Sequence, residues 1–469
     1  MPPGDYGVQS VKQVLVFVPG LMGSELWDAD GKLWPGNAKD WAFGYDDAKF
    51  TRLCASDLQP RDIVRSAVGI VDIYGGWIRA FSKLSDYQTH EPLFVEGGNV
   101  PTLFTVPYDW RKSITVGAAA LSNVIACVVD LHGAEVEIHL VAHSMGGLVA
   151  RYFLQSGEFD ESVGLDRIDS FLTFGTPHRG AIVALAAALG HKKADFMSVE
   201  QSKKLANDPR FQGLYNLFPQ AGARPIWERG GVGRLRAHDV FEDDIATALG
   251  LDLQSLAETA SVHAALAKPW PDIRTFLFVG TRFETMTHVL WDGTNSVVVK
   301  SRDGGDGTVN LHGAMLESQQ IRFTDKNHSE LIKSDEAREA IQDIFNAYGI
   351  LLAPDATVSL TVSDHFIESE QPIEILVTLT GPGTAVHGRL FLERARIDPK
   401  LGDELADSDF DSSAAEFSRE LRYDGPDLVM MNVKFDGVKG PVAFRPVFET
   451  DELVPRRFVG SSFLVKAPD

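Results

Sequence analysis

The feature of this sequence that most restricts its fold is an alternation of short apolar runs with segments of helical periodicity, which continues to about residue 350. Six runs have the length and composition of buried strands: residues 13–18, 101–107, 135–143, 169–175, 273–280 and 320–325. Apolar residues recur every three or four positions in three segments between them: residues 73–84, 114–131 and 148–154. The alternation predicts the α/β fold class, with a mostly parallel sheet covered by helices on both faces.

Two segments depart from this alternation. Residues 181–270 are helix-like and partly charged and fall between two predicted strands, so we expect a helical cap inserted there. After residue 355, apolar and polar residues alternate at period two, and turn sequences such as GPGT and DGPD separate the runs. The sequence therefore predicts an α/β domain over residues 1–350 and an antiparallel β-sandwich over residues 355–469.

Composition restricts the partners and the compartment. The chain of 469 residues is 44% hydrophobic and 23% charged, which is typical of a globular protein. Its net charge of −21 repels nucleic acid and anionic lipid headgroups, so we expect no nucleic-acid partner. Transient contact with a membrane or micelle stays open, and the C-terminal domain is expected to bind a partner, dock or stabilise.

The N-terminal apolar stretch has no basic segment before it and ends in Pro-Gly, which favours a first strand over a secretion signal. The later run AIVALAAALG is far shorter than the ~20 residues of a membrane span. We therefore predict a cytoplasmic protein without a transmembrane segment. Cys54 and Cys127 supply neither a disulfide framework nor a metal-ligand set, so no metal or cofactor is expected.

Ser144 lies where the run EVEIHLVAH passes directly into the helical sequence MGGLVARYFL. A strand, a serine flanked by small residues (here Ala142 and Gly146) and a helix are typical of a nucleophile elbow, in which the turn is too tight for larger side chains. A serine at this point can also cap the following helix, which is a common use of serine. The choice between the two depends on whether the chain supplies a base and an acid.

Asp306 and His328 follow Ser144 in the order acid, then base. Both come just after predicted strands, and parallel strands would bring them to the same edge of the sheet as Ser144. A serine, a histidine and an aspartate in this relation carry out acyl transfer. Aspartate is also an ordinary turn residue in DGGDGT, where Asp303 is the alternative acid, and His328 has the alternative of a surface loop.

A glycine-rich turn follows the first predicted strand in the sequence VFVPGLMGS. Acyl transfer requires donors for a developing negative oxygen, and backbone N–H groups on preset loops need little reorganisation to act as such donors. We expect the amides of Leu21 and Met145 to form this oxyanion hole.

Several motifs resemble, in sequence order, those of the lecithin:cholesterol acyltransferase-like lipases and acyltransferases of the α/β-hydrolase superfamily: VPGLMGSEL, PYDWR, AHSMGGLVARYFL, FGTPHRG, LYNLFP and GDGTV. The resemblance covers about residues 12–335 and not the C-terminal domain. It implies an α/β-hydrolase fold in which Ser144 is the nucleophile, Asp306 the acid and His328 the base. It also implies cleavage of carboxylic esters of lipid-like substrates through an acyl-enzyme, or transfer of the acyl group to an alcohol.

A binding or scaffold protein on the same fold is the competing class, because a fold does not guarantee chemistry. His143 is expected to support the elbow, and Asp109 and Arg111 to form a buried ion pair. His178 either lines the pocket or fixes its loop through hydrogen bonds. Large apolar residues of the cap either pack it onto the sheet or line an acyl tunnel: Phe196, Phe211, Leu214, Tyr215, Leu217 and Phe218. The predicted substrate contacts among these residues are His178, Leu214, Tyr215, Leu217 and Phe218.

Overall fold

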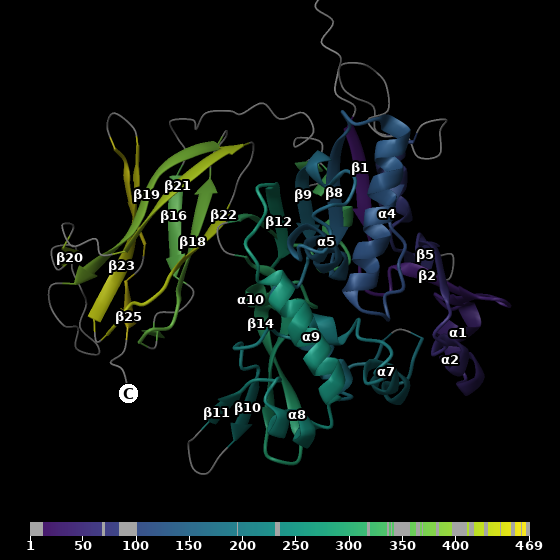
Figure 1. Cartoon of the computed structure of the whole chain (residues 1–469). Helices are drawn as coiled ribbons and strands as arrows, with labels where there is room; N and C mark the ends of the chain where they lie inside the picture. Colours follow the sequence, from purple (N-terminus) through teal and green to yellow (C-terminus); the bar gives the residue numbers. More distant parts are fainter. Residues whose placement is uncertain are drawn as a thin grey trace, which may run out of the picture. The chain divides into compact units, whose positions relative to one another are not determined.

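The computed structural model forms two compact units, Met1–Met315 with Thr324–Ser334, and Leu316–Phe323 with Asp335–Asp469 (Figure 1). The residues that it describes are 13–67, 71–83, 101–194, 196–229, 235–316, 319–334, 337–338, 340–341, 357–362, 366–367, 369–380, 384–395, 410–411, 417–425, 430–440, 442–451, 455–460 and 462–465. Residues 351–354, between the two predicted domains, lie outside these ranges.

The strands of the first unit are β1 (Gln13–Val18), β2 (Ser24–Asp28), β3 (Gly31–Trp34), β4 (Gln59–Ile63), β5 (Ser66–Ala67), β6 (Val71–Asp72), β7 (Leu103–Thr105), β8 (Glu137–His143), β9 (Ile168–Phe174), β10 (Ile226–Arg229), β11 (Leu235–His238), β12 (Arg274–Gly280), β13 (Phe283–Trp291) and β14 (Ser296–Gly305). Its helices are α1 (Ala38–Phe43), α2 (Asp47–Leu53), α3 (Gly75–Lys83), α4 (Ile114–His132), α5 (Met145–Gln155), α6 (Ile182–Ala188), α7 (Val199–Ala206), α8 (Asp243–Leu249), α9 (Leu253–Leu266) and α10 (Leu311–Ala314). Short 3₁₀ turns are η1 (Leu165–Arg167), η2 (Tyr215–Leu217) and η3 (Leu331–Lys333).

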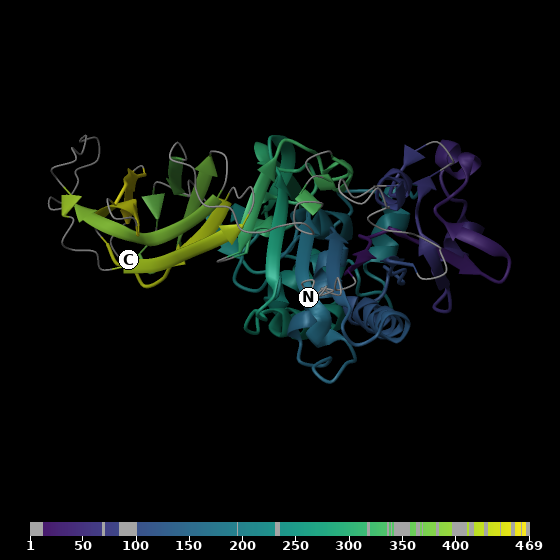
Figure 2. The same ribbon diagram turned by 90° about the horizontal axis from the view of Figure 1, so that it is seen from above.

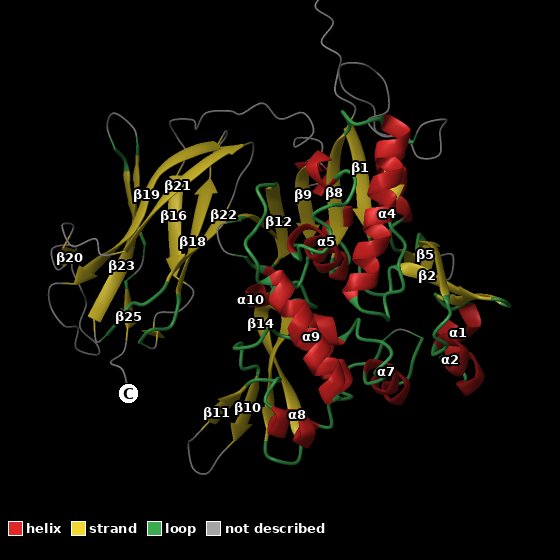
Figure 3. Ribbon diagram, viewed as in Figure 1, coloured by secondary structure: helices red, strands yellow, loops and turns green. Residues whose placement is uncertain are grey.

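A parallel sheet in the order β12-β9-β8-β1-β7 forms the centre of the first unit, as the alternating sequence predicted. Residues on both faces of β1, β8 and β9 are buried along almost their whole length, because the sheet is covered on both sides. Helices α4 and α5 contact each other and β1, and α5 also contacts β8. Figure 2 shows their blue ribbons along one side of the strands, and Figure 3 shows the alternation of helix and strand.

Helix α4 has the length and apolar composition of a membrane-crossing helix. One face of it is nevertheless buried within the unit, where it presents Ile114, Leu121, Ile125 and Val128 to the core. Packing against α5 and β1 accounts for the apolar residues on this face of α4, and 33% of the helix is buried.

The segment predicted as a helical cap, residues 181–270, is not wholly helical. It contains α6, α7, α8 and α9, but also the antiparallel hairpin β10–β11. Strand β10 pairs with β13, and β13 pairs with β14, so these strands form a separate four-stranded sheet. Sequence periodicity missed this sheet because its strands are short or carry many polar residues.

The second unit contains β15 (Gln320–Thr324, except its last residue), β16 (Thr357–Val362), β17 (Phe366–Ile367), β18 (Ile373–Thr380), β19 (Thr384–Ala395), β20 (Phe410–Asp411), β21 (Phe417–Gly425), β22 (Met430–Phe435), β23 (Val442–Thr450), β24 (Arg457–Val459) and β25 (Phe463–Val465). The strand order is β16-β18-β22-β15 in one sheet and β17-β25-β23-β19-β20 in the other. Residues of both sheets share one apolar cluster, which includes Ile375, Val433, Leu390 and Phe448. All pairings within these two sheets are antiparallel except β17 with β25.

The division of the chain differs from the predicted boundary between residues 350 and 355. Strand β15 pairs with β22, with Gln320 opposite Met431 and Ile321 opposite Met430. The sequence had assigned this strand to the first domain because it continues the spacing of the preceding strands. Long-range pairing, which periodicity does not report, joins it to the second unit.

The turn between β8 and α5 packs tightly against the end of β1. A Cβ on Gly146 would lie 2.3 Å from the carbonyl oxygen of Val18 and 2.5 Å from that of Pro19. Both distances are far below van der Waals contact, and the obstructing atoms belong to the backbone. Gly146 therefore allows the helix to start directly against the central strand.

We predict that Gly146→Ala lowers the free energy of unfolding by about 3 kcal/mol, because the new methyl group overpacks a site that cannot relax. Gly222→Ala is the control for packing, since a Cβ on Gly222 would meet no atom within 4 Å, although Gly222, unlike Gly146, has a positive φ of 90°. Gly222→Ala is expected to lower the free energy of unfolding by only about 1 kcal/mol, because alanine disfavours the left-handed conformation. Denaturant unfolding measures both, and equal losses would contradict the packing argument.

Candidate active site

Ser144 occupies the turn from β8 into α5 with a left-handed backbone, at φ 53° and ψ −127°. Such a conformation costs a non-glycine residue of order 1–3 kcal/mol, and surrounding contacts must hold it. The Ser144 N–H donates to the carbonyl of Phe174 on β9 at 2.9 Å, and its carbonyl accepts the Gly147 N–H at 3.0 Å. Although Ser144 is at the N-cap position, its side chain makes no capping hydrogen bond, so its hydroxyl is directed elsewhere.

The hydroxyl of Ser144 lies 2.9 Å from Nε2 of His328, and Nδ1 of His328 lies 2.7 Å from Oδ2 of Asp306. A carboxylate only accepts, so Nδ1 of His328 donates to Asp306, and Nε2 is the nitrogen that faces the serine hydroxyl. The structure thus brings together the three residues that the order along the sequence predicted, from positions up to 184 residues apart.

Asp306 is held from several directions and is 2% exposed. Its Oδ1 accepts the amides of Thr308 at 2.9 Å and Val309 at 2.7 Å, which leaves Oδ2 for His328. The His328 N–H also donates to the Asp306 carbonyl at 2.9 Å, so Asp306 and His328 are joined through both backbone and side chain. The alternative acid, Asp303, lies within strand β14. The supporting role of Thr308 and Val309 was not predicted from the sequence, although both belong to the GDGTV motif.

Two glycines make room for this pair. A Cβ on Gly175, which has φ 60°, would lie 2.9 Å from Nδ1 of His328 and 3.0 Å from Oδ2 of Asp306. A Cβ on Gly280 would lie 2.6 Å from that of Asp306. The carboxyl ends of β9 and β12 can therefore approach the acid and base only as bare backbone.

The loop after β1 lies directly beside Ser144, since a Cβ on Gly20 would be 2.8 Å from the Cβ of Ser144. Among the described residues, neither the Leu21 N–H nor the Met145 N–H donates a hydrogen bond to the protein. The Gly20 N–H, by contrast, donates to the hydroxyl of Tyr74 at 3.1 Å. The arrangement leaves the two amides predicted for the oxyanion hole available to a ligand.

His143 connects the elbow to two neighbouring loops, in the supporting role that the sequence predicted. Its Nε2 lies 2.9 Å from the carbonyl oxygen of His328, and its Nδ1 lies 2.8 Å from the hydroxyl of Tyr74. Burial lowers the pKa of His143 to about 3, so its imidazole is neutral at ordinary pH. Tyr74 was missed from the sequence because it belongs to no motif.

A cavity of about 450 Å³ opens at Ser144 and His328. Its walls are mostly apolar, and they include Leu21, Met22, Val183, Met197, Leu205, Phe211, Leu214 and Leu217. Lys192 and Lys193 also line it. Of the predicted substrate contacts, Leu214 and Leu217 lie on this wall.

The structure corrects the other three predicted contacts, since His178, Tyr215 and Phe218 do not line the cavity. His178 is 1% exposed, and its Nε2 lies 3.0 Å from the hydroxyl of Thr173, so it fixes its own loop. The rings of Tyr215 and Phe218 stack at 4.4 Å between centroids. These two side chains pack the interior of the first unit because η2 turns them away from the cavity.

Asp109 and Arg111 form the predicted buried ion pair, with Nη2 of Arg111 2.7 Å from Oδ2 of Asp109. Their side chains are 3% and 0% exposed. The guanidinium also donates to the carbonyl of Ala55 at 2.6 Å and lies over the ring of Phe211. Since Arg111 and Phe211 both line the cavity, the pair supports its wall.

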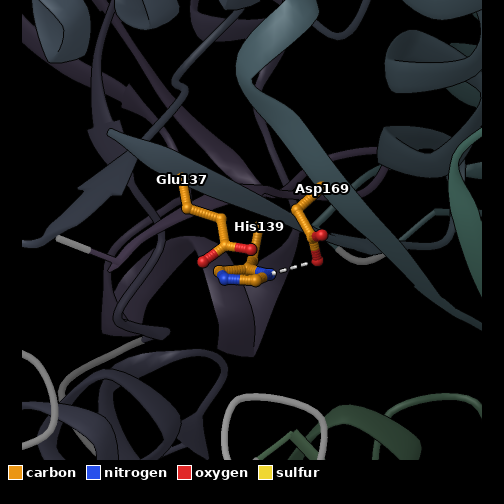
Figure 4. A group of neighbouring side chains, drawn as sticks. All are labelled: Glu137, His139 and Asp169. Atoms are coloured by element: carbon orange, nitrogen blue, oxygen red, sulfur yellow. Dashed lines mark ion pairs between the residues drawn. The ribbon is translucent and has the colours of Figure 1, made fainter. Parts of the chain in front are cut away.

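A second polar group, Glu137, His139 and Asp169, lies at the start of β8 and β9, at the opposite end of the strands from Ser144 (Figure 4). Its ligand atoms lie within 4.8 Å of one another, as in a metal site. However, Arg274 donates a hydrogen bond to Asp169, so one of the three potential ligands is already paired with a cationic side chain. Burial also lowers the pKa of His139 to about 4, so this imidazole is neutral at ordinary pH. The negative charge of Asp169 is therefore offset by Arg274 and not by His139.

A parallel sheet with a serine on a strained strand-to-helix turn, followed by an acid and a histidine after later strands, defines the class of α/β-hydrolases. The family comparison agrees, because the model of the lecithin:cholesterol acyltransferase family matches residues 88–250 of this chain. The resemblance to that family predicted from the motifs is thereby confirmed over this segment. The VPGLMGSEL and GDGTV motifs lie outside it. A search of curated proteins found no match.

Three solved structures show distant likenesses to this chain. A metagenomic carboxyl esterase has 15% identity and a TM-score of 0.30, covering 70% of this chain and 67% of its own. Spo0M, a sporulation control protein from Bacillus subtilis, has 14% identity and a TM-score of 0.18, covering 24% of this chain and 49% of its own. The bacterial hydrophobin BslA has 9% identity and a TM-score of 0.13, covering 25% and 99%. TM-scores this low do not define a shared fold.

We predict that Asp109→Ala strongly destabilises the first unit, because it leaves the Arg111 guanidinium buried without its counter-charge. The expected loss in the free energy of unfolding is about 3 kcal/mol or more. Glu284→Ala, which removes the partner of an exposed pair with Lys300, is the control and should leave the unfolding midpoint unchanged. A small effect of Asp109→Ala in denaturant unfolding would show that water or another group compensates Arg111.

Proposed function

We propose that the first unit is a serine hydrolase that cleaves carboxylic ester bonds of lipid-like substrates through an acyl-enzyme. The observation that carries this proposal is the continuous hydrogen-bonded line from the Ser144 hydroxyl through His328 to Asp306, with distances of 2.9 and 2.7 Å. A serine hydroxyl is a poor nucleophile unless a base accepts its proton as it attacks. Nε2 of His328 lies in hydrogen-bond contact with the Ser144 hydroxyl.

In the first step Nε2 of His328 takes the proton as Oγ of Ser144 attacks the ester carbonyl. Asp306 keeps the proton of His328 on Nδ1 and offsets the positive charge that develops on the ring. The carbonyl oxygen becomes an oxyanion, and the amides of Leu21 and Met145 are the donors proposed for it. One such donor is worth about 3–4 kcal/mol of barrier.

The tetrahedral intermediate then collapses, the carbon–oxygen bond to the alcohol breaks, and His328 gives its proton to the leaving alkoxide. The acyl group remains on Ser144. Water repeats the sequence: His328 removes its proton, the hydroxide oxygen attacks the acyl carbonyl, and Ser144 leaves with the proton from His328. The products are the alcohol and a carboxylic acid.

The cavity at Ser144 supports a lipid-like acyl group as the substrate. Its apolar wall removes a hydrocarbon chain from water, which is worth about 0.8 kcal/mol for each methylene group buried. Lys192 and Lys193 on the same wall offer positive charge in a chain whose net charge is −21. We therefore expect the acyl chain to lie among the apolar residues, with the polar part of the substrate toward the lysines.

Acyl transfer to an alcohol is the second candidate, because the matching family model is that of an acyltransferase. An acceptor hydroxyl would replace water in the second step, with the same proton transfers. Supplying an acyl ester with and without a long-chain alcohol separates the two. New ester indicates transfer, and free acid alone indicates hydrolysis.

We predict that p-nitrophenyl esters and phospholipids will be cleaved by the wild type and that kcat falls by at least about 1,000-fold in Ser144→Ala and His328→Ala. Asp306→Asn should lower kcat about 10,000-fold, because it favours the wrong imidazole tautomer. Ser329→Ala, at a serine that also lines the cavity, is the control and should retain activity. A fluorophosphonate should label the wild type at Ser144. A wild type that is neither labelled nor active would indicate the binding-protein alternative.

We predict that Val183→Phe shortens the acyl chain that the enzyme accepts, because Val183 lines the cavity and the larger ring fills part of it. The ratio of kcat/KM for a long-chain to a short-chain ester should fall about 10-fold or more, since several methylene groups lose their place. Val163→Phe, on a side chain that is 59% exposed, is the control. An unchanged ratio would mean that the chain binds elsewhere.

A further inference from the structure

We propose that Tyr74 is a positioning residue for the reaction. Its hydroxyl holds the loop after β1, which carries Gly20 and Leu21, and through His143 it also holds the loop that carries His328. This inference rests on the proposed function, because it concerns the geometry of the same site. The hydroxyl of Tyr74 touches neither Ser144 nor the ring of His328 by any hydrogen bond among the described residues. Its effect is therefore exerted through the backbone of these loops.

The direction of each hydrogen bond follows from what each atom can do. The His328 carbonyl only accepts, so Nε2 of His143 donates to it and carries the proton of the neutral imidazole. Nδ1 of His143 is then an acceptor, and the Tyr74 hydroxyl donates to it at 2.8 Å. The remaining lone pairs of the Tyr74 oxygen accept the Gly20 N–H at 3.1 Å. One continuous chain thus runs from Gly20 through Tyr74 and His143 to the backbone of His328.

Burial keeps this chain in one protonation state. Tyr74 is 3% exposed, and burial raises the pKa of its hydroxyl above the ordinary value, so the donor proton stays in place. Burial also keeps the pKa of His143 near 3. The charged and titratable groups acting on His143 are His328, Asp306 and Lys333, and none of them outweighs the effect of burial.

The segment that carries Tyr74 is itself fixed on both sides. The amides of Ile73 and Gly75 both donate to the carbonyl of Arg65, at 3.1 and 2.9 Å. Nζ of Lys333, just after the His328 loop, donates to the carbonyl of Asp72 at 3.1 Å. The ring of Tyr74 also packs edge-on against Phe17 of β1 at 5.1 Å between centroids.

The chemical consequence concerns which amides of the loop after β1 face the substrate. Tyr74 takes up the Gly20 N–H, so the peptide before Gly20 is turned away from the reacting carbonyl. The next amide, that of Leu21, is left for the oxyanion. The same hydroxyl also holds His143 against the His328 carbonyl. Tyr74 therefore fixes the positions of both the Leu21 amide and His328 beside Ser144.

The test compares Tyr74→Phe, which keeps the ring and removes only the hydroxyl, with Tyr45→Phe. Tyr45 is also buried, and its hydroxyl donates to the carbonyl of Leu33 at 2.7 Å, away from the base loop. Tyr74→Phe should lower kcat for a p-nitrophenyl ester about 10- to 100-fold, because small misplacements of catalytic groups have such effects. KM should stay unchanged, and the rate of fluorophosphonate labelling of Ser144 should fall in parallel. Tyr45→Phe should leave kcat and labelling unchanged.

Two variants of His143 test its two hydrogen bonds separately, the one to Tyr74 and the one to the His328 carbonyl. His143→Gln retains an amide near the position of Nε2, and His143→Asn retains one near Nδ1. Each should lower kcat, and combining either with Tyr74→Phe should cost less than the product of the single effects, because all act through one chain. These variants also provide the test if Tyr74→Phe does not fold, which circular dichroism would reveal.

Wild-type kcat and labelling in Tyr74→Phe would overturn the proposal, as would a rise in KM at constant kcat. Fully multiplicative effects of the Tyr74 and His143 changes would overturn it as well. Failure of the proposed function gives a different result, since the wild type would then not be labelled at Ser144. Labelling without hydrolysis of any ester would reject the substrate class and still measure the role of Tyr74.

Discussion

The left-handed backbone of Ser144 is the constraint on which the site depends. It lets a buried strand pass into a helix without a linker, and it directs the hydroxyl away from the capping position toward His328. Two contacts with the neighbouring strands maintain this strained conformation. The Ser144 N–H donates to the Phe174 carbonyl, and Gly146 packs against the end of β1. The same tightness requires bare backbone at Gly20, whose Cβ would overlap that of Ser144.

Around this turn the structure uses the backbone more than side chains to set distances. The Asp306 carboxylate accepts two amides of its own loop, and His328 donates its N–H to the Asp306 carbonyl. His143 holds the carbonyl of the same histidine from the other side. The imidazole is therefore positioned by hydrogen bonds to the backbone N–H and the carbonyl of its own residue.

Much of this arrangement could be predicted from the sequence, because it follows from local rules. The strand ends agree within about two residues, as periodicity normally allows. Small residues beside Ser144 indicated the elbow, and chain order selected Asp306 and His328. The substrate contacts of the cap were harder to predict from the sequence. Around η2, Leu214 and Leu217 line the cavity, whereas Tyr215 and Phe218 do not. A short 3₁₀ turn has no periodicity from which to predict that division.

The sequence by itself determined the parallel sheet, the elbow and the residues at its strand ends, since these depend on hydrophobic period, side-chain size and order along the chain. Only the tertiary structure decided that β15 pairs within the second unit and that residues 283–305 form a hairpin beside the cap. It also brought Tyr74, a residue without a motif, to the centre of the hydrogen bonds around Ser144. The reason is physical: these partners are joined by contacts between segments distant in sequence, which no local pattern records.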